Sequence, residues 1–104
     1  MAGLGKFLKQ AQKMQEQMQR VQEELAAREV EGTAGGGAVK AVARCDGSLV
    51  SVKIDPKVVD QNDVEMLEDL VVSAVANALE IAKKTQSDEM AKVTAGMNIP
   101  GLQM

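Results

Sequence analysis

Leu4 to Leu25, LGKFLKQAQKMQEQMQRVQEEL, is the stretch that decides the fold of this chain. Its apolar residues recur with alternating gaps of 3 and 4, which makes a heptad repeat with apolar a and d positions. They are Leu4, Phe7, Ala11, Met14, Met18, Val21 and Leu25. The residues between them are mainly Gln, Lys, Glu and Arg, which favour helix. The repeat therefore predicts a helix over about residues 4–27 that needs a second helix along its apolar seam.

A helix of this length spans roughly 35 Å, more than a small domain can cover. We therefore expect its N-terminal part to project as an arm. The arm has a basic flank turned away from the seam, because Lys6, Lys13 and Arg20 share heptad position c and Lys9 lies beside them at f. Two interpretations stay open: a solvated face helped by a helical Glu16–Arg20 pair, or a contact surface for an anionic partner.

Composition limits the class of protein. A chain of 104 residues makes one domain, and with a single aromatic residue, Phe7, its core must be aliphatic and Met-rich. A long helix and a thin core together favour an obligate oligomer. No apolar run approaches the ~20 residues of a membrane span, and the N-terminus lacks a signal-peptide block. We therefore expect a cytoplasmic protein without membrane contact.

The residue types needed for catalysis are missing from the sequence. The chain has no His and only one Cys, Cys45, so it offers neither a nucleophile with its base nor a metal-ligand cluster. We expect no enzyme activity, no metal, no cofactor and no small-molecule substrate. Binding of single-stranded nucleic acid would lack the aromatic platforms on which bases stack.

Charge is unevenly distributed along the chain. The net charge of −3 argues against indiscriminate binding of nucleic acid. Residues 1–20 nevertheless carry four basic side chains against Glu16 alone, whereas residues 55–69 carry six acidic side chains against Lys57 alone. Local fields decide partners more than the net charge does. We therefore expect an acidic body with a basic arm.

Turn signals and alternation follow the first helix. Gly35-Gly-Gly37 indicates a flexible hairpin connection, and Asp46-Gly47 is a strong signal for a hairpin turn. Between them, alternation places Val39, Ala41 and Ala43 on one face of a strand. We predict a three-stranded antiparallel β-meander, with strands at about residues 28–33, 38–45 and 49–54.

A second long helix is predicted at about residues 63–84, capped by Asn62 together with Glu65. Thr85 to Asp88 resembles a break with a new cap, followed by a short helix at about 88–95 and a flexible tail at 97–104. This helix is apolar enough to pack on two partners, the sheet and another helix, and its small residues four apart would permit close backbone approach. We expect the dimer interface to contain Val71, Ala74, Val75, Ala78 and Ala82.

These elements predict an α+β fold in a single domain over residues 1–104: a long N-terminal helix, a three-stranded antiparallel β-meander and a long broken C-terminal helix. The first helix enters the sheet by its C-terminal end, and the second leaves by its own C-terminal end. Both distal segments can therefore project on the same side. The second distal segment is also basic, with Lys83, Lys84 and Lys92.

Several segments occur in a characteristic order along nearly the whole chain: Lys9-Gln-Ala-Gln-Lys-Met-Gln-Glu16, Val30-Glu-Gly32, Gly35-Gly-Gly37, Val52-Lys-Ile-Asp-Pro56, Asp63-Val-Glu-Met-Leu-Glu-Asp-Leu70 and Met97-Asn-Ile-Pro100. In these segments the chain resembles the YbaB/EbfC family of bacterial nucleoid-associated proteins. The resemblance implies a tweezer-like homodimer with protruding helical arms. It also implies binding of double-stranded DNA and alteration of its conformation, with roles in nucleoid organisation and gene regulation.

Carried over by arm location and charge, the DNA contacts implied by the resemblance would be Lys6, Lys9, Lys13, Arg20, Lys83, Lys84 and Lys92. Asp88-Glu89 departs from a basic arm and weakens the case for the C-terminal segment. The alternative function is a coiled-coil protein-binding scaffold or chaperone-like adaptor, whose apolar arm residues would bind clients. Salt dependence separates the two, because counterion release weakens DNA binding steeply as salt rises.

Overall fold

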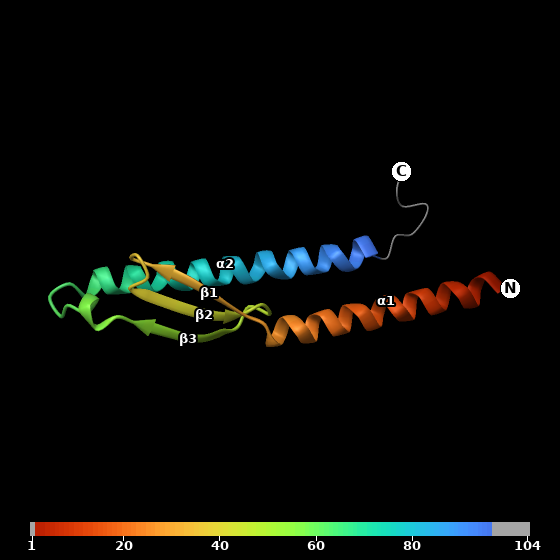
Figure 1. Ribbon diagram of the computed structural model, residues 1–104, viewed down its shortest axis with the longest axis horizontal. Helices are drawn as coiled ribbons and strands as arrows, with labels where there is room; N and C mark the ends of the chain where they lie inside the picture. Colours follow the sequence, from red (N-terminus) through yellow and green to blue (C-terminus); the bar gives the residue numbers. More distant parts are fainter. Residues whose placement is uncertain (1, 97–104) are drawn as a thin grey trace.

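The computed structural model describes residues 2–96 and shows an elongated molecule of 74 × 27 × 16 Å. The C-terminal helix packs along a small sheet, and both long helices extend beyond the same end of that sheet (Figure 1). This arrangement confirms the predicted α+β fold. The elements are α1 (Ala2–Ala27), β1 (Glu29–Ala34), β2 (Val39–Arg44), β3 (Leu49–Ile54), the 3₁₀ helix η1 (Pro56–Val58) and α2 (Val64–Gly96).

The sheet is an antiparallel meander in the order β1-β2-β3. The first connection turns through Gly35, Gly36 and Gly37, whose φ angles of 62°, 68° and 95° lie in the region that glycine tolerates best. The second turn is closed by the Asp46 carboxylate, which accepts hydrogen bonds from the Ser48 backbone and hydroxyl at 2.9 and 2.6 Å. These hydrogen bonds hold the pKa of Asp46 below its usual value.

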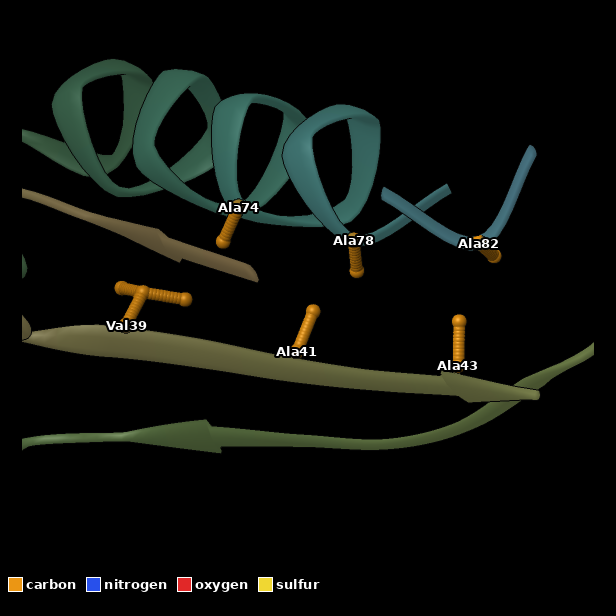
Figure 2. Packing of buried hydrophobic residues seen from close by; sticks show 6 residues of the cluster. All are labelled: Val39, Ala41, Ala43, Ala74, Ala78 and Ala82. Atoms are coloured by element: carbon orange, nitrogen blue, oxygen red, sulfur yellow. The ribbon is translucent and has the colours of Figure 1, made fainter. Parts of the chain in front are cut away.

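The core is a contact between α2 and one face of the sheet. Val39, Ala41 and Ala43 of β2 point at three alanines of α2 (Figure 2). All six side chains are buried, and the alanines are Ala74, Ala78 and Ala82. Because these side chains are small, the backbone of α2 approaches the sheet closely, and β1 contributes Gly32 at the closest point.

This packing corrects the expected dimer interface. The stripe of Ala74, Ala78 and Ala82 is covered by the protomer's own sheet, so it has no surface left for a second copy. Val71 and Val75 are half-buried and pack against the same core. A row of small residues permits close approach of any backbone, and here the backbone is that of the sheet.

The predicted break in the second helix is wrong. α2 runs without interruption from Val64 to Gly96, through the Thr85–Asp88 segment and the expected short helix. Thr, Ser and Asp each cost only a few tenths of a kcal/mol in a helix interior, and packing on α1 outweighs that cost. The N-cap also differs, since Asp63 rather than Asn62 accepts a hydrogen bond from the Met66 backbone at 3.2 Å.

Strand β3 is an edge strand that α2 leaves largely uncovered, since α2 packs mainly on β1 and β2. Its pairing with β2 contains a bulge beside Val42 and Ala43 that leaves Val50 without an opposite residue. Val52 packs against the core, but Val50 and Ile54, which alternation also directs inward, are exposed. The body of the molecule therefore keeps an apolar edge.

The expected flexible tail at 97–104 lies outside the described residues. Within residues 2–96, no helix is both long enough and apolar enough to cross a membrane.

Candidate nucleic-acid interface

Beyond the sheet, α1 and α2 run antiparallel to each other and form a helical arm pair (Figure 1). On α1 the proximal part of the heptad seam is covered: Met14, Met18 and Val21 are half-buried and Leu25 is buried. On α2 the half-buried residues of this region are Thr85, Glu89, Met90 and Val93. The seam that predicted a partner helix therefore finds it within the same chain, at least along its proximal part.

A small ionic cluster ties the base of the arm pair. Arg28, which directly follows α1, places Nη1 3.5 Å from Glu89 Oε1 on α2. The same carboxylate oxygen accepts from Lys92 Nζ at 3.1 Å. The Arg28 carbonyl also accepts a hydrogen bond from the Cys45 backbone at 2.9 Å. The cluster joins the end of α1, the end of the sheet and the distal half of α2.

The four basic residues predicted on the first arm form one exposed stripe. Lys6, Lys9, Lys13 and Arg20 are all exposed, and at ~100° per residue they fall within a sector of roughly 60° on the side of α1 away from Met14 and Met18. Successive lysines are about 5 Å apart along the helix axis. That spacing is comparable to the ~3.4 Å of helix axis per charge on one strand of DNA, so the stripe can meet several phosphates at once.

The three lysines predicted on the second arm do not form such a stripe. Lys83 and Lys84 are exposed but adjacent, so their side chains leave α2 about 100° apart. Lys92 is exposed and shares the Glu89 carboxylate with Arg28. The acidic pair Asp88-Glu89 lies in a segment that was expected to be basic, and the structure shows its effect. Glu89 neutralises basic charge at the base of the arms.

A second basic surface lies on the sheet and is not among the DNA contacts predicted from the sequence. Lys40 of β2 lies directly opposite Lys53 of β3, and both are exposed on the sheet face turned away from α2. Arg44 lies on the same face, opposite Glu29 of β1. Among the described residues no ion pair joins these cations to Glu29 or Glu31. A two-residue turn at Asp46-Gly47 would predict the Lys40–Lys53 pairing, although in the structure Leu49 lies opposite Ala43 and the bulge restores that register.

Acidic charge gathers at the opposite end of the molecule from the N-terminal tip of α1 (Figure 1). A shallow depression of about 350 Å³ at the start of α2 is lined by Asp63, Glu65, Met66, Asp69, Leu70 and Ser73. Within residues 2–96 no group of acidic or sulfur side chains is arranged to hold a metal ion. The basic end and the acidic end thus lie at opposite ends of the long axis. The basic end can contact a polyanion while the acidic end stays away from it.

This architecture defines a class of small helix–sheet–helix proteins with projecting helical arms. The crystal structure of an uncharacterized protein from Helicobacter pylori has the same fold, with a TM-score of 0.72. The two chains are 19% identical, and the match covers 90% of this chain and 96% of that chain. Residues 1–97 match the sequence profile of the YbaB/EbfC DNA-binding family. The chain therefore belongs to the YbaB/EbfC DNA-binding family.

Curated relatives agree with this assignment. A nucleoid-associated protein of Caldanaerobacter subterraneus subsp. tengcongensis is 56% identical over 95% of this chain and 89% of its own length. A nucleoid-associated protein of Pelotomaculum thermopropionicum is 50% identical over 95% of this chain and 94% of its own length.

Proposed function

We propose that this protein is a nucleoid-associated protein that binds double-stranded DNA as a homodimer, mainly through phosphate contacts from its helical arms, and alters DNA conformation. The observation that carries the proposal is the exposed stripe of Lys6, Lys9, Lys13 and Arg20 on one side of α1. Membership of a DNA-binding family and the nucleoid-associated names of the relatives support the partner and a location in the nucleoid.

Electrostatics explains how an acidic protein binds DNA. The net charge is −3, so diffuse attraction cannot hold the protein on a polyanion. The arm brings its cations to the phosphates while the acidic start of α2 stays at the far end of the molecule. Phosphate contacts position a protein on the duplex without reading its sequence. We therefore expect weak dependence on DNA sequence and strong dependence on salt.

The lysines of α2 have a smaller part in this proposal. Lys83 and Lys84 diverge, so only one of them can face a duplex that lies along the arms. Lys92 reaches DNA only after leaving Glu89, to which it is bound at 3.1 Å. The stripe on α1 therefore carries most of the contact.

The homodimer is supported by the apolar edge of the body rather than by the alanine stripe. Leu49, Val50 and Ile54 of β3 are 48%, 41% and 38% exposed, and Val59 beyond η1 is 56% exposed. β3 also has unpaired backbone groups along its outer edge, as every edge strand does. A second copy on this edge would bury both features and leave the arms free.

Titration of a labelled duplex at several salt concentrations tests the function. DNA binding by the arms predicts a linear fall of log K with log salt, at roughly 0.9 per phosphate contacted. Two duplexes of unrelated sequence should give nearly the same line. A salt-independent interaction, or none, would overturn the proposal and favour a scaffold whose exposed apolar side chains bind protein clients.

A further inference from the structure

The heptad seam of α1 has two environments along one helix. Its proximal residues Met14 to Leu25 are half-buried or buried in the arm pair. Its distal residues are not: Leu4, Phe7 and Leu8 are 60%, 66% and 55% exposed. We call these three residues the tip patch. The patch contains the chain's only aromatic side chain.

The exposure follows from the length of α2. Glu89 lines the same small pocket as Val21 and Leu25, which fixes the level of α2 along α1. From Glu89 to Gly96, α2 advances only about 10 Å, which is one heptad. The first turns of α1 therefore extend past the end of α2 (Figure 1).

The charges on α1 are placed so that they do not oppose contact between two identical helices. With Leu4 at position a, the charged residues of the arm occupy c and f. The e and g positions that border the seam hold Leu8, Gln10, Gln15, Gln17 and Gln22, and charge first appears there at Glu24. Charges at e and g normally select the partner of a coiled coil. Without them, no like charges border the seam when two copies of the same basic arm meet there.

The tip patch and the basic stripe lie on opposite sides of the same helix. At ~100° per residue, the centre of Leu4, Phe7 and Leu8 is roughly 180° from that of Lys6, Lys9 and Lys13. A helix whose lysines rest on phosphates therefore turns its tip patch away from the DNA. The patch remains available to a second protein molecule while the DNA is bound.

We propose that the tip patch is a contact between two copies of this chain, which pair their α1 tips in antiparallel orientation and so bind DNA cooperatively. Antiparallel pairing about Phe7 sets Leu4 of one copy against the small Ala11 of the other. The contact is short and therefore weak in dilute solution. It becomes effective when DNA holds two molecules close together, because the local concentration is then high. The inference rests on the proposed DNA binding and adds an interface separate from the β3 edge.

The first test compares binding to a duplex that holds one molecule with binding to a long duplex that holds many. The variant replaces Phe7→Gln and Leu8→Gln, and the control replaces Gln12→Ala and Gln19→Ala, which lie at heptad position b and do not border the seam. We expect the variant to keep wild-type affinity and salt slope on the short duplex. On the long duplex it should lose cooperativity and bind several-fold more weakly, whereas the control should match the wild type.

Two results of this titration would overturn the tip contact. One is wild-type cooperativity in the variant. The other is an equal loss on both duplexes, which would mean that the apolar tip touches DNA itself. If the wild type does not bind the short duplex in a salt-dependent way, the proposed function is refuted instead. The tip contact can then still be decided by cysteine crosslinking of concentrated protein without DNA.

Cysteine crosslinking gives that second, independent test. The native Cys45 is buried, so an introduced thiol is the reactive one. Phe7→Cys should form disulfide-linked dimers under mild oxidation, with a higher yield on long DNA, and Lys9→Cys on the opposite side should not. In dilute protein, Phe7→Cys should react rapidly with a small thiol reagent. Slow reaction there would show that the patch is covered within its own chain and would overturn the proposal.

Discussion

Gly32 of β1 lies directly against the backbone of Ala78 in α2. A Cβ on Gly32 would lie 2.7 Å from the Ala74 carbonyl oxygen and equally close to the Ala78 Cα, and closer still to the Ala78 backbone nitrogen. These are backbone atoms, which cannot rotate away as a side chain would. The contact between helix and sheet therefore depends on the absence of a side chain at Gly32.

Gly32→Ala should accordingly destabilise the fold. Overpacking a tight contact typically costs about 1–3 kcal/mol, and here α2 must shift bodily. Urea unfolding followed by circular dichroism measures the change. Gly5→Ala is the matched control, because nothing lies near its Cβ and alanine favours a helix over glycine by up to about 1 kcal/mol. Equal stability of Gly32→Ala and wild type would contradict the close approach.

Ala78→Glu tests the reassignment of the alanine stripe. A carboxylate placed among Ala41, Ala43 and the sheet has no partner, and an unpaired buried charge costs several kcal/mol. We expect the variant to lose its cooperative thermal transition altogether. Ala76→Glu, on the exposed side of the same helix, should remain folded. A stably folded monomer of Ala78→Glu would restore the stripe to a dimer interface.

Sedimentation tests the homodimer itself. The wild type should sediment at micromolar concentration as a species of about twice the chain mass of 11.0 kDa. Val50→Lys should shift it toward the monomer while leaving the helical spectrum intact, since Val50 is exposed at the bulge of β3. Lys57→Ala nearby serves as the control. A wild-type protein that sediments only as the monomer would rule out the homodimer.

The carboxylate of Glu89 should restrain DNA binding at the base of the arms. Glu89→Gln removes its charge and releases Arg28 and Lys92, so we expect tighter binding and a salt slope steeper by up to roughly 0.9 for each new phosphate contact. Asp88→Asn makes the same change of formal charge one residue away, where no ion pair is formed within residues 2–96. Equal effects of the two substitutions would show that only net charge matters.

Periodicity predicted most of the fold because it was strong where the elements are long. The heptads from Leu4 to Leu25 define α1, and the alternation of Val39, Ala41 and Ala43 gives the buried face of β2 correctly. The break at Thr85–Asp88 was wrong because residues of modest helix propensity are overridden by packing. That packing includes the Arg28–Glu89 pair, whose members lie 61 residues apart and carry no local signal of their contact.

The core and the candidate interface were predictable to different degrees. The alanine stripe was recognised, but the element that packs on it was not. Small residues predict close packing of a backbone, but they do not indicate which element supplies that backbone. Gly32 in β1 could have indicated the sheet, because a glycine within a strand often marks the close approach of another backbone. On α1, helical spacing alone places the lysines in one stripe, as the structure has them. Their contact with DNA is still a prediction, and the Lys40–Lys53 pair depended on a strand register that residue alternation does not provide.

A charge-deletion experiment on α1 measures how much of the DNA binding comes from the lysines of the arms. Lys6→Ala, Lys9→Ala and Lys13→Ala combined should leave α1 intact, since alanine is the best helix former and these residues avoid the seam. In a dimer the change removes six cations. If half of them meet phosphates, the salt slope should become shallower by about 2.7, equally on duplexes of unrelated sequence.

Lys40→Ala with Lys53→Ala is the comparison, because it removes basic charge from the sheet and leaves the arms unchanged. The measurement is the slope of log K against log salt for both variants and the wild type on one duplex. We expect a much shallower slope and weaker binding for the arm variant, with little change for the sheet variant. Loss of binding in the sheet variant, with wild-type affinity and slope in the arm variant, would contradict this expectation and place the DNA on the sheet.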